Sequence, residues 1–94
     1  MEKLLSFLCC ELDCYLDEIK GDRRGKISKK RKLIVLALVW KNLTTTEIAE
    51  ILSKDRSSIR TIVKNSSVFD YLEAKELLRK YEIWKNYTLQ KKFS

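Results

Sequence analysis

Basic and hydroxyl side chains crowd one short stretch of the chain, where they recur at helical spacing. Lysine and arginine side chains reach guanine edges or phosphates, and small hydroxyl residues let a helix backbone approach such a target closely. The members of this set are Lys54, Arg56, Ser57, Ser58, Arg60, Thr61 and Lys64. Their chemistry is the non-covalent recognition of a polyanion.

Two short helices would position this set. Thr44 followed by Glu47 is a capping box, which predicts a first helix from about residue 45. The run from Ser53 to Asp55 predicts a turn, with Asp55 able to cap a second helix near Arg56. Glycine is usual in such a turn, and a serine can adopt its conformation at modest cost.

The second helix is expected to bury Ile59 together with Ile62 or Val63. Its outward residues are then Arg56, Ser57, Arg60, Thr61 and Lys64. The small residue Ala49 suits the close crossing of the two helices. This pattern predicts a helix-turn-helix, in which the second helix enters the major groove of DNA. The alternative is a plain helical hairpin that happens to be polar outside.

Three runs of sequence together carry a family resemblance: SKKRKLIVLALVW, EIAEI and LSKDRSSIR. Over roughly residues 28–66 the chain resembles the C-terminal DNA-binding domain of the bacterial replication initiator DnaA and related Trp-repressor-like domains. Lys54 to Ile59 match that family's Arg-Asp-His-Ser/Thr-Thr-Val motif, with Arg56 in place of histidine and Ser58 in place of the commoner threonine. The resemblance implies duplex DNA binding. It does not imply replication initiation, because these 94 residues contain no ATPase domain.

Composition predicts one all-α domain, residues 1–94, with about five helices. The chain has no proline and two glycines, and 45% of its residues are hydrophobic, which is ordinary for a globular protein. No stretch has the alternation of a β-hairpin. The predicted parts are an acidic amphipathic helix (1–19), a basic linker (20–32), the helix-turn-helix core (28–66) and a C-terminal helix (67–90).

The formal charge of +7 is unevenly distributed. Residues 1–19 carry a net charge of −4, whereas residues 20–34 carry +7. Gly21 and Gly25 predict a flexible linker, and Ser28 can cap a core helix opening at Lys29. A basic cluster at a helix N-terminus opposes the helix dipole, so local folding gives no reason for it. Lys29, Lys30 and Arg31 are therefore predicted to contact phosphates, where the resemblance also implies basic contacts; a solvated lysine-rich face is the alternative.

The two terminal helices have wide apolar sides. In the first, Leu5, Leu8 and Leu12 repeat at helical spacing, and the helix either packs within the domain or pairs with a second copy. In the last, which Ser67 and Asp70 can start, the predicted core-facing residues are Phe69, Leu72, Leu77, Leu78, Tyr81 and Trp84. Trp40, at the end of the central helix, is also predicted to lie in the core. A homodimer through the N-terminal or the C-terminal helix is possible, since dimers double a DNA site.

Other classes of protein have little support. The chain has no histidine, glycine-rich phosphate loop or metal-ligand set, which argues against an enzyme, a metal or a cofactor, and no small-molecule substrate is apparent. Cys9, Cys10 and Cys14 are predicted to be buried thiols that act as small hydrophobic residues, rather than a disulfide framework. The longest apolar run, Leu33 to Trp40, is too short to span a bilayer, so we expect a cytoplasmic protein without membrane contact.

The sequence therefore predicts a sequence-specific binder of double-stranded DNA, acting as a small transcription or replication regulator. A protein-protein interaction module on a helix-turn-helix scaffold is the main alternative. Binding of single strands by the C-terminal aromatic residues is a third, in which Ser57 and Arg60 would have no role.

Overall fold

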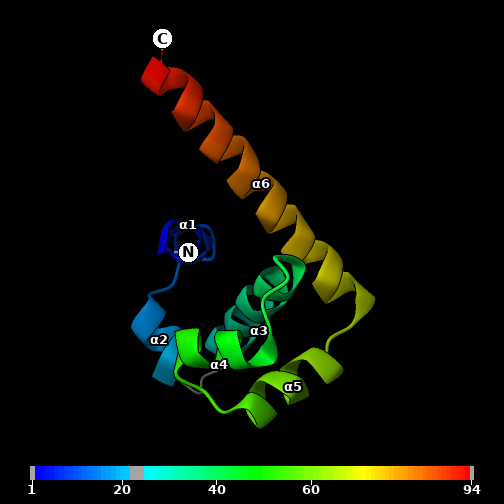
Figure 1. The fold of residues 1–94 in the computed structure, drawn as a ribbon. Coiled ribbons are helices and arrows are strands. Elements are labelled where there is room, and N and C mark those ends of the chain that lie inside the picture. Colours follow the sequence, from blue (N-terminus) through cyan, green and yellow to red (C-terminus); the bar gives the residue numbers. More distant parts are fainter. Residues whose placement is uncertain (1, 22–24, 94) are drawn as a thin grey trace.

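Six α-helices make up the part of the chain that is described. The computed structural model describes residues 2–21 and 25–93, and the side chains of residues 3–21 and 27–87. No strand occurs in these ranges, which confirms the all-α class (Figure 1). None of the helices in the same ranges is long and apolar enough to cross a bilayer.

The N-terminal region contains two helices, so the prediction of one helix over residues 1–19 is wrong. These are α1 (Glu2–Glu11) and α2 (Leu16–Gly21). The chain turns between them because Asp13 adopts a left-handed conformation, with φ of 53°. Aspartate tolerates this conformation better than most residues. The backbone N–H of Tyr15 donates to the carboxylate of Glu18 over 2.9 Å, which helps to start α2.

The apolar side of α1 packs within the domain. Leu4, Leu5 and Leu8 are buried, and the ring of Phe7 packs edge-on against Tyr81 and at a tilt against Trp84 of the last helix. Of the two predicted alternatives for this helix, intramolecular packing is the one found.

The central helix α3 (Gly25–Trp40) is the core of the molecule, as predicted. All six residues from Leu33 to Leu38 are buried. Its start is earlier than predicted, so Ser28 is an exposed residue within the helix and not its cap. Burial of Ile27 explains this, since the first turn packs into the core instead of forming a linker. Residues 22–24 of the predicted linker lie outside the described residues.

The helix-turn-helix region consists of α4 (Thr45–Leu52) and α5 (Arg56–Lys64). The Thr44 side chain accepts from the N–H of Glu47, and the Glu47 carboxylate accepts from the N–H of Thr44, which confirms the capping box. Asp55 occupies the N-cap position of α5, but its side chain makes no capping hydrogen bond.

Three helices end in the same way, with a non-glycine residue in the left-handed conformation. These residues are Asp13 after α1, Asn42 after α3 and Ser53 after α4, with φ of 53°, 64° and 54°. In each case the next residue's N–H reaches back five residues, from Cys14 to Cys9, from Leu43 to Leu38 and from Lys54 to Ala49. This is the Schellman motif. It confirms that Ser53 replaces the usual glycine of the turn.

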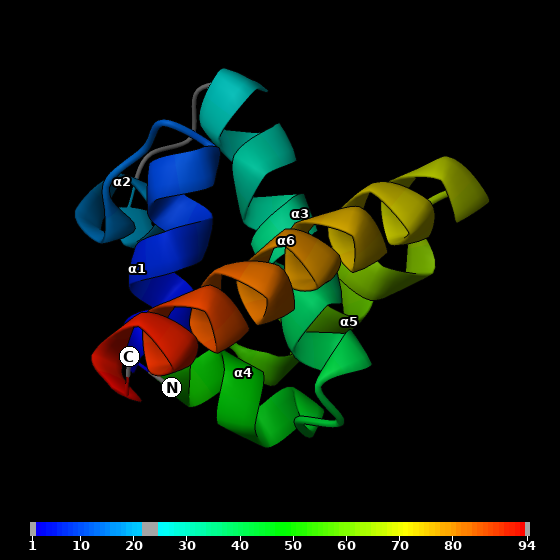
Figure 2. The same ribbon diagram turned by 90° about the horizontal axis from the view of Figure 1, so that it is seen from above.

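The last helix, α6 (Val68–Phe93), crosses α3 and α1 and then extends beyond them (Figures 1 and 2). Reciprocal hydrogen bonds between Ser67 and Asp70 start it, as predicted. It continues three residues past the predicted end at residue 90. Two ion pairs, Lys32 with Asp70 at 3.6 Å and Lys41 with Glu82 at 2.7 Å, join it to α3 and to the residue after α3.

The prediction of which residues of α6 face the core is partly wrong. Ala74, Leu77 and Tyr81 are buried, but Phe69 and Leu72 are 82% and 55% exposed. Leu72 lies about 140° around the helix from Leu77, so the two cannot share one buried face.

Trp40 also differs from the prediction, since it is 43% exposed. Its Nε1 donates to the carbonyl oxygen of Tyr71 over 3.0 Å, and its ring packs edge-on against Tyr71. This polar group explains why the ring lies at the edge of the α3–α6 contact: the indole N–H needs a partner.

Candidate nucleic-acid interface

Helix α5 lies at the opposite end of the molecule from the protruding end of α6 (Figure 1). Ile59 on its inner side is fully buried, and Ile62 and Val63 are partly buried against the core. These three residues are the ones predicted to hold the helix in place. They fix which side of α5 faces outward.

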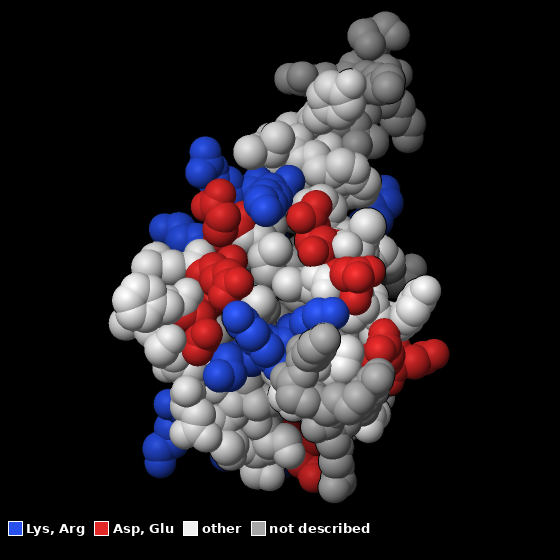
Figure 3. Space-filling model, turned by 180° about the vertical axis from the view of Figure 1, so that it is seen from behind, with Lys and Arg blue, Asp and Glu red and all other residues white. Residues whose placement is uncertain are grey.

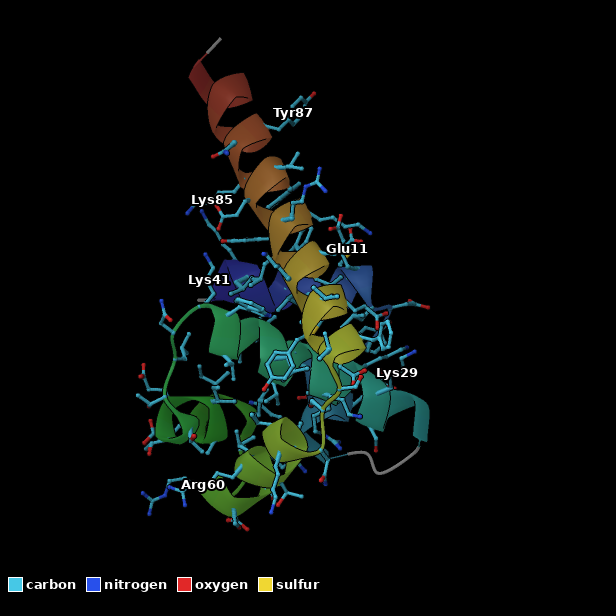
Figure 4. All side chains as sticks on the ribbon, turned by 90° about the vertical axis from the view of Figure 1, so that its right-hand side faces the viewer. Glu11, Lys29, Lys41, Arg60, Lys85 and Tyr87 are labelled. Atoms are coloured by element: carbon cyan, nitrogen blue, oxygen red, sulfur yellow. The ribbon has the colours of Figure 1, made fainter. Side chains whose placement is uncertain are left out.

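The outer side of α5 carries every predicted recognition residue of that helix. All of them are exposed: Arg56, Ser57, Ser58, Arg60, Thr61 and Lys64. Among the residues whose side chains are described, none forms an ion pair with Arg56, Arg60 or Lys64. Arg60 extends away from the body of the molecule (Figure 4). The face is therefore basic, polar and open to a partner.

Two further predicted residues, Lys54 and Thr61, are less available to a partner, one through partial burial and the other through a hydrogen bond within the helix. Lys54 is half-buried in the turn between α4 and α5, next to Ser53. The Thr61 hydroxyl donates to the carbonyl oxygen of Ser57 over 2.9 Å. Its proton is therefore committed within the helix, while the oxygen can still accept a hydrogen bond from a partner.

A groove runs beside this face, between α5 and the start of α4. Its volume is about 510 Å³, and its lining is mostly apolar, with Arg60 and Lys64 among the lining residues. The lining residues are Val39, Leu43, Thr44, Thr45, Ile48, Ile59, Arg60, Val63 and Lys64. Thr45 was not among the predicted site residues. Its place in the first turn of α4, directly after the N-cap residue Thr44, is the signal that could have found it.

The basic residues at the start of α3 do not form one surface with α5. Lys29 is exposed, but it lies well apart from Arg60 (Figure 4). Lys30 donates from Nζ to the carbonyl oxygen of Asp13 over 2.9 Å. Arg31 is only 9% exposed and donates from Nε to the carbonyl oxygen of Ile19 over 2.5 Å. Two of the three predicted phosphate contacts thus hold the α1–α2 region against α3.

The sequence pattern did not reveal this role because it depends on the break at Asp13. That break places the carbonyl groups of Asp13 and Ile19 where lysine and arginine side chains can satisfy them. Cations near a helix C-terminus are favourable in this way. In the sequence, the break between the two helices is indicated only by Asp13, because aspartate adopts the left-handed conformation more readily than most residues.

Charge on the back of the molecule is mixed. Figure 3 shows basic groups flanked on both sides by acidic ones, without a continuous basic surface on that face. Long-range attraction of a polyanion to this face is therefore weaker than the net charge alone suggests.

The cysteines form a separate cluster between α1 and α2. Cys9 and Cys14 are buried free thiols, as predicted, while Cys10 is exposed, so the prediction of burial is wrong for Cys10. Burial raises the pKa of the Cys9 thiol to about 11, and the nearby Cys14 adds to the shift. Burial also raises the pKa of Cys14. Within the described residues, no group of histidine, cysteine, aspartate or glutamate side chains is arranged to hold a metal ion.

Comparison with protein-family models, with curated proteins and with solved structures gives no match to this chain. The resemblance of residues 28–66 to the DnaA C-terminal domain therefore depends on the short motifs alone. The geometry of α4, α5 and the turn between them is the basis for assigning a function.

Proposed function

We propose that this protein binds double-stranded DNA in a sequence-specific manner, with α5 in the major groove, and acts as a small transcription or replication regulator. A DNA partner and the free thiols Cys9, Cys10 and Cys14 both favour a cytoplasmic setting. The proposal assigns no catalytic step to the chain.

One observation carries the proposal: the exposed cations of α5 have no ion-pair partner among the described side chains, although the helix itself is firmly packed through Ile59. Surface cations without structural partners are available to replace the counterions of a phosphate backbone. The nine residues of α5 form a helix about 13 Å long, and the major groove is wide enough to admit it.

Each cation has a distinct role in this proposal. Arg60 lies in the middle of the exposed face, where a groove-bound helix comes closest to base edges, and we assign it to a guanine. Lys64 lies one turn further along and contacts a phosphate. Arg56 and Lys54 lie near the N-terminal end of α5 and position the helix on the backbone.

The hydroxyl residues are small, so they leave the outer surface of α5 free of bulky side chains. Ser57 and Ser58 lie in the first turn of α5 and are exposed, so the backbone can approach the bases without a steric barrier. Thr61 offers its oxygen as an acceptor, since its proton is donated to Ser57. An acceptor of this kind suits the exocyclic amino group of adenine or cytosine.

The start of α3 contributes less than the sequence predicts. Lys29 remains available for a phosphate, whereas Lys30 and Arg31 are engaged with backbone carbonyl groups. We therefore propose at most one backbone contact from this segment. Its loss would weaken binding to all sequences alike.

Selection of bound sequences from a random duplex pool tests the proposal. We expect the wild-type chain to enrich one motif, and the double variant Arg56→Glu with Arg60→Glu to enrich none. The matched control is Lys3→Glu with Lys85→Glu, which makes the same change in net charge at exposed positions outside α5. If the control loses binding as fully as the α5 variant, the binding is only general charge attraction and the proposal fails.

A further inference from the structure

Helix α6 has an exposed strip on the side away from α3 and α1. Its residues recur at alternating spacings of three and four: Phe69, Leu72, Glu76, Arg79, Ile83 and Asn86, all of them exposed. This is the heptad spacing of a coiled-coil seam. The buried residues Ala74, Leu77 and Tyr81 belong to a different side of the helix, so the strip is not needed for the fold of one chain.

The strip has a charged centre with one large aliphatic residue on either side of it. Leu72 and Ile83 are 55% and 59% exposed, although both are large aliphatic residues. Between them, Glu76 and Arg79 form an ion pair at 3.4 Å within the helix, instead of the pairing of Glu76 with Lys80 that i,i+4 spacing favours. Both charged side chains are largely exposed and can exchange partners at little cost.

We infer that this strip pairs with the same strip of a second copy of the chain, in antiparallel orientation. A two-fold axis midway between Glu76 and Arg79 places Glu76 of one chain opposite the partner's Arg79, and the reverse. The same register places Leu72 opposite the partner's Ile83. Leu72 and Ile83 therefore meet in an apolar contact, and opposite charges meet at the centre. At each end of the strip, Phe69 lies opposite the partner's Asn86.

The charge pattern selects this orientation. In a parallel pair, Glu76 would face the partner's Glu76 and Arg79 would face the partner's Arg79, which is unfavourable at both positions. Beside the seam, exposed Glu73 and Lys80 also become complementary in the antiparallel register, because each lies opposite the other residue of the second chain. A polar pair within an apolar seam is a known means of fixing the register of paired helices.

The other terminal helix cannot offer an equivalent surface, because Leu4, Leu5 and Leu8 of α1 are buried within the chain. Of the two predicted dimer helices, α6 is therefore the one with an unused face. The inference does not depend on DNA binding, since the strip and α5 share no residue. A chain that fails to bind DNA can still dimerise in this way.

Sedimentation equilibrium of the full chain tests the inference, from low micromolar to submillimolar concentration. We expect a monomer–dimer equilibrium for the wild type. Glu76→Arg and Arg79→Glu should each weaken dimerisation at least about tenfold, because like charges then meet at the centre. The double variant Glu76→Arg with Arg79→Glu restores complementarity in the antiparallel register and should dimerise like the wild type. Glu50→Arg on α4 is the control for the change in net charge made by Glu76→Arg, and Lys3→Glu on α1 is the control for Arg79→Glu.

Three results would overturn the inference. One is a wild type that stays monomeric throughout the concentration range. Another is equal dimerisation of the wild type and both single variants, which would exclude this strip. The third is a double variant as weak as the single ones, which would exclude the antiparallel register. Circular dichroism of each variant confirms that the exposed substitutions leave the helices intact.

Discussion

Arg31 donates its Nε–H to the carbonyl oxygen of Ile19, linking the most basic stretch of the chain to the end of a short acidic helix. Arg31 is buried, and it lies twelve residues after Ile19 in the sequence. A residue predicted to contact DNA thus holds α2 against α3.

Replacement of Arg31 by alanine should lower the free energy of unfolding by about 1–3 kcal/mol, because a buried carbonyl loses a charged donor and the side-chain stem leaves a gap. Lys29→Ala is the matched control, since Lys29 is exposed and its loss should change stability by less than about 0.5 kcal/mol. Urea denaturation measures both. Equal stabilities of the two variants would show that the Arg31 contact contributes nothing to the fold.

Ser53→Gly should raise the free energy of unfolding by up to about 1 kcal/mol, because glycine adopts the left-handed conformation without strain. The same substitution at Ser6, an exposed position within α1, should instead destabilise the protein by about 0.5–1 kcal/mol. Thermal or urea unfolding measures whether each substitution raises or lowers the free energy of unfolding. If both substitutions lower the free energy of unfolding, Ser53 is not strained in its left-handed conformation.

The carboxylate of Asp70 should make stability depend on pH in the acid range. Hydrogen bonds from Ser67, first of all from its backbone N–H, lower the pKa of Asp70 in the folded state, and Lys32 adds to this effect. A lowered folded-state pKa contributes stability that is present above the unfolded value, about 4, and is lost as pH falls through the folded one. Asp70→Asn should therefore flatten the stability profile below about pH 4. A profile identical to that of the wild type would contradict this assignment.

Thiol labelling should separate the three cysteines. At pH 8, native protein should react quickly at exposed Cys10, while Cys9 and Cys14 react slowly because burial raises the pKa of both. Cys10→Ser should remove the fast phase and leave the slow ones. Fast reaction of all three thiols in the native state would show that α1 does not stay packed on the domain.

Local signals were enough to predict much of the fold. The capping box at Thr44 and the start of α6 at Ser67 were both predictable, because each depends on residues within one turn of the helix. The inner side of α5 was predictable for a similar reason: a short helix with few apolar residues has only one side that it can bury. The exposure of Arg56, Arg60 and Lys64 follows from it.

Tertiary contacts account for what the sequence did not predict. The role of Arg31 required knowledge of where the Ile19 carbonyl lies, and that depends on the turn at Asp13. The exposure of Phe69 and Leu72 was missed because α6 has apolar residues on several sides, and contacts with α3 and α1 decide which side is buried. Ile27 extended α3 beyond its predicted start by burying the first turn.

The most direct test of the central proposal compares Arg60→Ala with Lys64→Ala on the preferred duplex and on random duplex, at one salt concentration. If α5 reads bases as proposed, Arg60→Ala should cost about 1–3 kcal/mol on the preferred site and relax its sequence preference, while Lys64→Ala should weaken both duplexes by the same factor. Both residues are exposed, so neither variant should lose much stability. An Arg60→Ala variant that loses the same factor on both duplexes would contradict the placement of α5 in the major groove.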